Sequence, residues 1–229
     1  MDRVTQSPAV YDRLFSEGGH EGVYHLPYWK SAYYPLFKAV LRTALRHDVR
    51  SILEVGCGNG AFAHLLADRT GLRYRGFDFS PVAVQRAIAR TGTPDRFYVD
   101  DATSGAAYER AEYDCIVCTE VLEHIEEDLR AVSHWRSGTL CICSVPNFDS
   151  ETHVRFFQST DDVVSRYGGL IDIESVIRIK KPVLADISMP SVLRALRWNR
   201  YRPRRLLEFL GVGSFESLGG WFLFCGIRR

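Results

Sequence analysis

Hydrophobic and polar positions alternate along the chain in blocks that predict strands and helices in turn. Short apolar runs rich in Val, Ile, Phe and Cys predict seven strands, at residues 52–55, 73–79, 96–102, 113–118, 137–146, 170–180 and 220–228. Stretches with helical spacing of apolar residues predict helices between them, at residues 33–46, 61–67, 82–90, 119–127 and 160–167. Strands that alternate with helices at this spacing predict an α/β fold with a doubly wound, mainly parallel sheet.

Local signals mark where three of these helices begin. Ser80 is the expected N-cap of the 82–90 helix, with Pro81 at the first helical position. Thr160 is the expected cap of the 160–167 helix. Pro35 lies near the first turn of the 33–46 helix, where the missing backbone N–H costs nothing.

The first 30 residues are dense in aromatic and His side chains and are interleaved with glycines. The aromatic and His residues are Tyr11, Phe15, His20, Tyr24, His25, Tyr28 and Trp29. Because glycine loosens the backbone, this mixture predicts a mobile segment rather than a packed helix. We therefore separate an N-terminal segment with its helix, residues 1–46, from a main domain at residues 47–229.

Composition limits the classes of protein that fit. The 229 residues suffice for one large α/β domain or a domain with a small lid, and the net charge of +1 gives no global attraction to nucleic acid or membranes. No apolar run approaches the roughly 20 residues that span a bilayer, and the polar N-terminus does not resemble a signal peptide. The six cysteines mostly fall in predicted strands, which indicates buried free thiols. We expect a cytoplasmic protein with no membrane partner.

The most informative stretch is ILEVGCGNG at residues 52–60, where a strand ends in three glycines before a helix. Gly56, Gly58 and Gly60 allow positive φ angles and let a ligand approach the bare main chain. A buried strand, a Gly-rich turn and a helix N-terminus together form a nucleotide-binding crevice.

Two cofactors compete for this crevice. Gly56, Gly58 and Ala61 satisfy the G-x-G-x-x-G/A dinucleotide pattern, and Asp78 lies near the position of its ribose-binding acid, which keeps an NAD-dependent oxidoreductase open. Glu54 argues against NAD, because a carboxylate in a strand buried on both faces needs a cationic or hydrogen-bonding partner. A ligand ammonium group is one candidate, and NAD carries none near its pyrophosphate.

The stretch resembles motif I of the class I S-adenosylmethionine (SAM) methyltransferases, E/D-x-G-x-G-x-G. Glu54, Gly56, Gly58 and Gly60 match that pattern at every position. The resemblance implies SAM as cofactor and a seven-stranded sheet whose last strand is antiparallel. It also implies an N-terminal lid and a cap insertion at about residues 182–218, before the last strand.

The resemblance assigns cofactor and substrate contacts. It implies that Asp78 accepts hydrogen bonds from both ribose hydroxyls, that Phe79 packs on the adenine, and that Asp101, followed by Ala102, binds the adenine amino group, with Asp100 as the alternative. Further cofactor contacts are expected from Cys57, Thr119 and Tyr28, and substrate contacts from Tyr24, His25 and Arg155. Plain docking of the N-terminal segment on the core is the open alternative for Tyr24, His25 and Tyr28.

A second stretch with chemical potential is TEVLEHI at residues 119–125. If it is helical, Glu120, Glu123 and His124 share one face. The two carboxylates then cap the helix N-terminus while His124 packs, or His124 acts as a general base toward a substrate hydroxyl or amine. The third interpretation is a divalent metal.

The metal interpretation includes His153, which follows the fifth predicted strand. E-x-x-E-H with a later His resembles the two-Glu, two-His site of the small-RNA 2′-O-methyltransferases, and ubiquinone-pathway O-methyltransferases share the E-x-x-E-H part. We expect Glu120, Glu123, His124 and His153 to converge, with His124, His153 and Glu120 as the catalytic candidates. Such mixed ligands suit Mg, Mn, Fe or Zn.

The segment from Lys180 to Arg205 is strongly basic, with eight Lys or Arg and one acid, Asp186. It fits an anionic acceptor, RNA or a solvated face. The function that we expect is methyl transfer from SAM to a hydroxyl or amine of a small molecule, such as a sugar or natural-product intermediate. The alternatives are a metal-dependent 2′-O-methyltransferase of RNA ends and a non-catalytic SAM-binding module.

Overall fold

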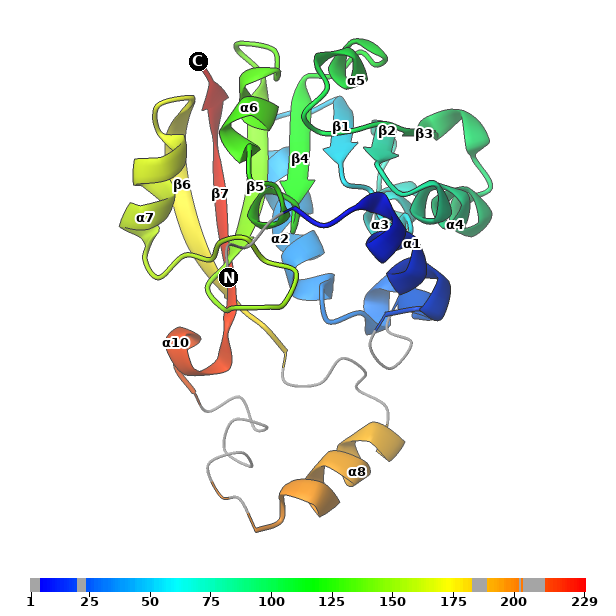
Figure 1. The fold of residues 1–229 in the computed structure, drawn as a ribbon, viewed down its shortest axis with the longest axis vertical. Coiled ribbons are helices and arrows are strands. Elements are labelled where there is room, and N and C mark those ends of the chain that lie inside the picture. The colour runs from blue at the N-terminus through cyan, green and yellow to red at the C-terminus, as the bar shows by residue number, and fades with distance from the viewer. Residues whose placement is uncertain (1–4, 20–23, 183–188, 202, 204–212) are drawn as a thin grey trace.

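The fold is organised on a seven-stranded sheet of order β3-β2-β1-β4-β5-β7-β6 (Figure 1). It is seen in a computed structural model that describes residues 5–19, 24–182, 189–201, 203 and 213–229. The strands are β1 Ser51–Val55, β2 Arg73–Asp78, β3 Phe97–Val99, β4 Cys115–Thr119, β5 Leu140–Pro146, β6 Ile171–Lys180 and β7 Gly220–Arg228. The predicted fold class is confirmed.

Strand direction follows the prediction as well. β1 pairs in parallel with both β2 and β4. β3 pairs in parallel with β2, and β5 pairs in parallel with β4. β7 pairs antiparallel with β5 and with β6, so the last strand is inserted in reverse between them. The carboxyl ends of β1, β2 and β4 therefore meet at one edge, which Figure 1 shows pointing toward the N-terminal helix.

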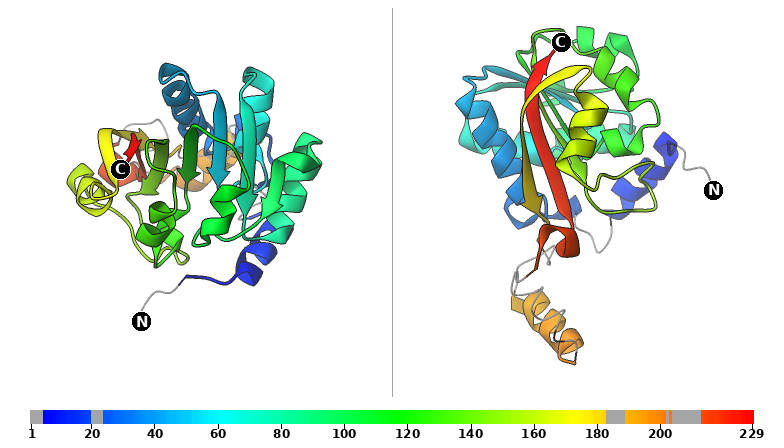
Figure 2. Two further views of the ribbon diagram at one scale, coloured as in Figure 1. Left: turned by 90° about the horizontal axis from the view of Figure 1, so that it is seen from above. Right: turned by 90° about the vertical axis from the view of Figure 1, so that its left-hand side faces the viewer.

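Helices cover both faces of the sheet (Figures 1 and 2). One face packs against α2 Tyr34–Arg46, α3 Ala61–Arg69 and α4 Pro81–Thr91. The other packs against α5 Gly105–Glu109, α6 Asp128–Ser133 and α7 Thr160–Tyr167. Short 3-10 helices are η2 Tyr28–Lys30, η3 Pro94–Arg96 and η4 Leu122–His124.

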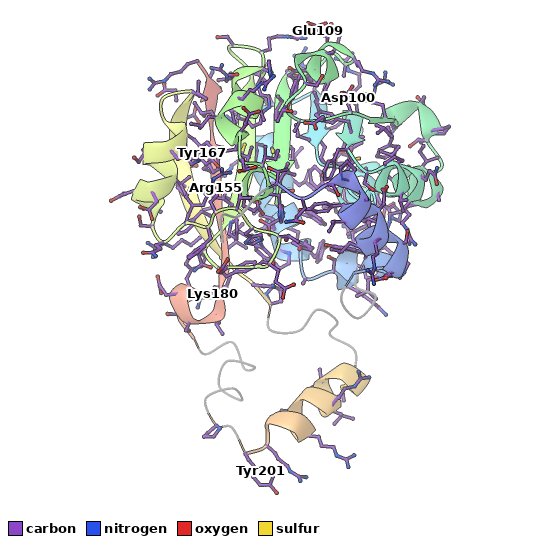
Figure 3. All side chains as sticks on the ribbon, viewed as in Figure 1. Asp100, Glu109, Arg155, Tyr167, Lys180 and Tyr201 are labelled. Atoms are coloured by element: carbon purple, nitrogen blue, oxygen red, sulfur yellow. The ribbon has the colours of Figure 1, made fainter. Side chains whose placement is uncertain are left out.

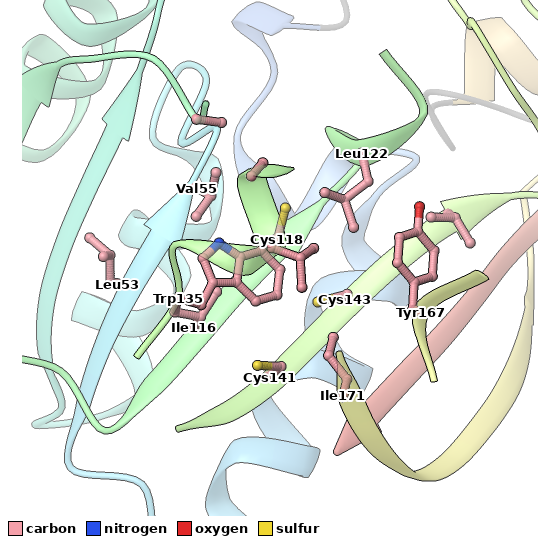
Figure 4. Close-up of a cluster of buried hydrophobic side chains, with 14 of the residues drawn as sticks. Leu53, Val55, Ile116, Cys118, Leu122, Trp135, Cys141, Cys143, Tyr167 and Ile171 are labelled. Atoms are coloured by element: carbon pink, nitrogen blue, oxygen red, sulfur yellow. The ribbon is translucent and has the colours of Figure 1, made fainter. Parts of the chain in front are cut away.

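The buried cluster under α5, α6 and α7 is close-packed (Figure 4). In it, Ile116, Cys118 and Cys141 of the central strands meet Trp135 and Tyr167 from the covering elements. All six cysteines are free and buried, as predicted. Strands buried on both faces explain why the sequence reads as continuous apolar runs there.

The structure corrects the helix predicted at residues 119–127. Only the 3-10 helix η4 forms, and the α-helix α6 begins later, at Asp128. Glu120 has a φ of 59°, in the left-handed region that interrupts an α-helix. The turn is tight because Val121 packs on Gly56, where an added Cβ would lie 2.3 Å from a Val121 methyl group.

The N-terminal segment also differs from the prediction, because it contains a packed helix, α1 Pro8–Glu17. Phe15 of α1 is buried. Asp12 accepts hydrogen bonds from the Ser80 hydroxyl and from the Val82 amide at the start of α4. Contacts distant in sequence therefore hold a segment whose local composition predicts mobility.

Two helix starts show how local chemistry sets the boundaries. Ser80 caps α4 as predicted, and its hydroxyl accepts from the Ala83 amide at 3.0 Å. The cap of α7 is Ser159 rather than Thr160. Its hydroxyl accepts from the Asp162 amide while the Asp162 carboxylate accepts from the Ser159 amide, a reciprocal capping box.

The expected insertion lies between β6 and β7. Its described helices are α8 Met189–Asn199 and α10 Phe215–Leu218. Three members of the basic segment, Arg202, Arg204 and Arg205, lie outside the described residues. No helix in the described ranges combines the length and the apolarity that a bilayer crossing requires.

A buried ion network links α6, α7 and the loop after β5. The Asp128 carboxylate is fully buried and accepts from Arg166 at 2.5 and 2.8 Å and from the Tyr167 hydroxyl at 2.8 Å. Arg155 completes the network at 3.2 Å. Figure 3 shows Arg155 and Tyr167 near each other on this side of the molecule. The network holds the chain that follows η4.

Asp128→Asn is expected to destabilise the protein by about 3–5 kcal/mol, because it leaves two guanidinium groups without their buried counter-charge. Urea unfolding measures the change. The matched control is Asp172→Asn, since Asp172 pairs with Arg229 at the surface at 3.5 Å. Its expected cost is about 0–1 kcal/mol. Equal unfolding midpoints for the two variants would contradict a stabilising role for the buried network.

Candidate active site

A cavity of about 970 Å³ lies where the carboxyl ends of β1, β2 and β4 meet. Its floor comes from the turns that follow these strands, and its cover comes from α1 and from the loop after β5. The lining residues from the three strand ends are Gly56, Gly58, Asp78, Phe79, Glu120 and Val121. In a parallel sheet this edge is where ligands bind.

The glycine turn has the backbone geometry that the sequence predicts. Gly56, Gly58 and Gly60 have φ angles of 70°, 50° and 72°. At Gly60, where α3 begins, an added Cβ would lie 2.9 Å from the Ala87 backbone, so the turn packs tightly on α4. Gly56 and Gly58 face the cavity, which leaves the main chain open to a ligand.

Glu54 finds its partner inside the protein. Its carboxylate is buried in β1 and accepts a hydrogen bond from the Tyr74 hydroxyl of β2. Gly76 makes this contact possible, because a Cβ there would lie 2.3 Å from that hydroxyl. Burial raises the pKa of Glu54 to about 8, and the Tyr74 hydrogen bond opposes the shift. The hydrogen-bonding partner that Glu54 requires is therefore Tyr74, and not a ligand ammonium group.

Asp78 is placed to bind a ligand at the end of β2. One oxygen accepts from the Gly58 amide at 2.9 Å and the other from the Ser80 amide at 2.9 Å. Burial raises the pKa of this carboxyl to about 6, and the two amide hydrogen bonds oppose that rise. Each carboxylate oxygen has a second lone pair, so the side chain can also accept from a diol in the cavity.

An aromatic wall flanks Asp78. Phe79 lies 5.0 Å from the Tyr11 ring of α1, measured between ring centroids, and both line the cavity. Asp100, Asp101 and Ala102 line its far end, after β3. Asp101 accepts from the amide and the hydroxyl of Thr103 at 2.7 Å. This end of the cavity offers ring faces and carboxylate acceptors suited to a purine.

The opposite end of the cavity holds two histidines. The rings of His124 and His153 lie edge to face with centroids 4.9 Å apart. Nδ1 of His124 lies 2.9 Å from the Thr152 carbonyl, and Nδ1 of His153 lies 3.2 Å from the Phe148 carbonyl. Because a carbonyl only accepts, each ring carries a proton on Nδ1, and a ring that is neutral then has its lone pair on Nε2.

Glu123 completes this group. It is fully buried, and neither carboxylate oxygen has a hydrogen-bond partner among the described residues. Burial raises its pKa well above the ordinary value, with a further contribution from Glu120. Possible ligand atoms of Glu123, His124 and His153 all lie within 4.8 Å of one another. A buried carboxylate with no donor needs a proton or a cation.

Burial also decides the protonation state of His124. It lowers the pKa of this imidazole to about 4, with the Thr152 hydrogen bond opposing and His153 reinforcing the shift. The ring is therefore neutral at pH 7. A neutral imidazole whose Nδ1 is held by a carbonyl has the arrangement of a metal ligand, whereas its low pKa makes it a weak general base.

Glu120 lines the same cavity but stands outside the group of three. Its carboxylate accepts from the Ser144 hydroxyl at 3.1 Å, and its amide donates to that hydroxyl at 3.2 Å. Burial raises its pKa, and the Trp221, Ser144 and Lys181 side chains oppose this. The structure thus brings all four predicted ligands to one region, with Glu120 on its edge.

Several predicted contacts lie elsewhere. Arg155 does not line the cavity, because its guanidinium donates to the carbonyls of Leu122, Ile125 and Glu126. It braces the η4 turn instead of facing a substrate. Cys57 and Thr119 are buried beside the cavity rather than on its wall.

The N-terminal candidates divide in the same way. Tyr24 lines the cavity, whereas His25 is exposed and lies 3.0 Å from Arg86. Tyr28 is buried against α3, where its hydroxyl donates to Asp68 at 2.9 Å. The contacts of Tyr28 are those of the alternative interpretation, in which the N-terminal segment simply packs on the core.

Many residues of the cavity wall were not predicted from the sequence, among them Tyr11, Phe148, Thr152 and Lys181. The Lys181 ammonium lies 4.5 Å from the centre of the Phe148 ring. Lys181 was visible only as one member of a basic run. Tyr11 carried no signal beyond the aromatic density of its segment.

Comparison with known proteins agrees with this geometry. A family model described as a methyltransferase domain matches residues 28–211. A ubiquinone biosynthesis O-methyltransferase of Salmonella arizonae is 35% identical over 88 residues. That match covers 37% of this chain and 36% of the relative, so the chain spans only about a third of the curated relatives that it matches.

Solved structures share the fold. The chain is similar to a putative methyltransferase bound to the Trm112 activator of Haloferax volcanii, with a TM-score of 0.65 and 18% identity over 96% of this chain and 97% of that one. It is also similar to the N-methyltransferase NodS of Bradyrhizobium japonicum in complex with S-adenosylhomocysteine (SAH), with a TM-score of 0.56 and 18% identity. That match covers 86% of this chain and 88% of NodS. Since the family model spans most of the sequence, the chain belongs to the methyltransferase-domain family.

Proposed function

We propose that the protein is a SAM-dependent methyltransferase that methylates a hydroxyl or amine of a small molecule. The observation that carries the proposal is one cavity with two chemically distinct ends. One end has the glycine turn, Asp78 and an aromatic wall, and the other has His124 and His153, with the Glu123 carboxylate buried behind them. A methyltransferase needs a site for the nucleoside of its cofactor and an adjacent site for the methyl acceptor, and the two ends meet these two needs.

The residues of the first end fit SAM. Asp78 has lone pairs for the ribose hydroxyls, the Phe79 and Tyr11 rings provide a surface for the adenine, and Asp101 or Asp100 can accept from its amino group. SAM, when bound, supplies a methyl group on a sulfonium that is already a good leaving group. The protein then contributes mainly alignment and exclusion of water.

At the second end we propose a divalent metal held by Glu123, His124 and His153. Three observations support this: the low pKa of His124, the Glu123 carboxylate without a hydrogen-bond partner among the described residues, and possible ligand atoms of these residues and His153 within 4.8 Å of one another. Two imidazoles and a carboxylate suit Mn, Fe or Zn, and Mg less well. A bound metal would polarise an acceptor oxygen and favour loss of its proton. A metal-free pair of histidines is the competing form of this site.

A hydroxyl acceptor is favoured over an amine. The curated relatives with matching segments are named O-methyltransferases. A neutral amine attacks through its own lone pair, whereas a hydroxyl becomes a good nucleophile only as it loses its proton, which Glu123, His124 and His153 would promote. Lys181 on the cavity wall supports an acceptor with negative charge.

The end of an RNA chain is the second candidate acceptor, supported by the same carboxylate and imidazole group and by Lys181 at the cavity. Binding of short RNA that weakens steeply with salt would favour it. SAH release with small acceptors, without RNA binding, would favour the small-molecule function. Product formation with any acceptor excludes a non-catalytic module.

Asp78→Ala is expected to weaken SAH binding by about tenfold to a hundredfold, because charged hydrogen bonds to the ribose are lost. Calorimetry measures the dissociation constant for SAH, and Asp172→Asn is the surface control. In the wild type, affinity should fall as the pH drops through about 6, where Asp78 gains a proton. Asp78→Asn should abolish that dependence. Stabilisation by NAD but not SAH in thermal melting would instead support the oxidoreductase.

His124→Ala and His153→Ala are each expected to lower turnover by about a hundredfold or more, while SAH affinity stays unchanged. The reason is that each ring would hold the metal that polarises the acceptor oxygen or, in the metal-free form, act on its proton. Turnover is measured as SAH release with the acceptor that a screen identifies. The control is His47→Ala, since His47 lies at the end of α2, outside the cavity. Full turnover in both cavity variants would contradict any chemical role for these rings.

Elemental analysis of protein dialysed against Mn²⁺ or Zn²⁺ separates the two forms of the site. We expect the wild type to retain metal, and Glu123→Gln and His124→Ala to lose it. His47→Ala should also retain it, which excludes the second group of possible ligands, His47, Glu174 and Cys225, as the source of the metal. EDTA should then abolish turnover. No retained metal, together with activity that survives EDTA, would leave the metal-free histidine pair.

A further inference from the structure

The helix α8 presents an apolar stripe to solvent. Met189, Leu193 and Leu196 are 68%, 58% and 39% exposed. Their spacing of four and three residues places them on one face of the helix. Figure 1 and the right-hand view of Figure 2 show α8 projecting from the α/β body, so the sheet and its covering helices do not bury this stripe.

Arginines border the stripe. Arg194 and Arg197 belong to α8 and are exposed, and Arg200 follows its last turn. Within the described parts of the chain no carboxylate pairs with any of the three. Tyr201 is 81% exposed, lies at the end of the helix (Figure 3) and stacks under the Arg200 guanidinium at 4.7 Å.

Charge is strongly segregated along the sequence. The segment from Lys180 to Arg205 has eight basic residues and one acid, a net charge of +7. Since the whole chain carries +1, the remainder carries −6. The small total therefore hides one basic segment on an otherwise acidic protein.

In place of the expectation that the protein has no membrane partner, we propose that α8 lies flat on an anionic lipid bilayer. Met189, Leu193 and Leu196 are then inserted among the lipids, and the arginines lie at the headgroups. A short helix with one apolar stripe and flanking arginines has the pattern of an interfacial helix. Its 11 residues are too few to cross a bilayer. Arginine stems extend over the apolar stripe while their charges reach the phosphates.

The other anionic partners explain less of the surface. RNA accounts for the arginines but leaves three exposed apolar side chains without a role. A small anionic acceptor needs guanidinium groups at the cavity, and Arg194, Arg197 and Arg200 do not line it. A bilayer offers acyl chains to the apolar stripe of α8 and phosphates to its arginines. The proposal does not depend on the methyltransferase function, because it uses only the surface of α8.

Co-sedimentation of the full chain with vesicles tests the proposal. We expect binding to vesicles that contain phosphatidylglycerol and little binding to pure phosphatidylcholine, with binding that weakens as salt rises. Leu193→Glu/Leu196→Glu and Arg194→Glu/Arg197→Glu should each weaken binding by about tenfold or more. The matched control is Val164→Glu, since Val164 is a 44% exposed apolar residue of α7 and should bind as the wild type does.

Circular dichroism and SAH binding show whether each variant is folded. Equal binding to both kinds of vesicle, or none, would overturn the proposal in folded protein. Loss of vesicle binding in the arginine variant but not in the leucine variant would also overturn the proposal. Binding of RNA by the same arginines would then assign the surface to RNA. A dimer that Leu193→Glu/Leu196→Glu converts to a monomer, without effect on vesicles, would assign the stripe to a second copy of the chain.

Discussion

The hydrogen bond from the Gly58 amide to the Asp78 carboxylate is the contact on which the site depends. It joins the turn after β1 to the end of β2, and it forms because glycine adopts the positive φ that aims the amide at this oxygen. The other oxygen of Asp78 holds the Ser80 amide, where α4 begins and where Asp12 attaches α1. One buried anion therefore organises two strand ends, a helix start and the cover of the cavity.

The other end of the cavity is built by tertiary contacts rather than by a regular element. Glu120 adopts the left-handed region, at a typical cost of about 1–3 kcal/mol for such a residue. Its neighbours hold it there: Val121 packs on Gly56, and Arg155 donates to the carbonyls of the η4 turn. The result is a buried carboxylate and two imidazoles whose possible ligand atoms lie within 4.8 Å of one another. Such a costly arrangement is characteristic of functional sites.

The sequence allowed the sheet, the glycine turn and the β7 boundaries to be predicted, because buried parallel strands and positive-φ turns impose strong local requirements on residue type. It did not allow η4 to be predicted, since the conformation of Glu120 depends on Gly56 and Ser144, which are distant in the chain. α1 was missed for the same reason: its position depends on Asp12 and Phe15 meeting elements of the core. The partner of Glu54 was foreseeable only with the strand register, which sets Glu54 opposite Gly76 and so within reach of Tyr74.

The most direct test of the central claim is a crystal structure of the protein with SAH. We expect the ribose hydroxyls on the Asp78 carboxylate, the adenine between Phe79 and the residues after β3, and the sulfur facing His124 and His153. A nucleoside bound elsewhere, or a sulfur directed away from the two imidazoles, would contradict the central claim.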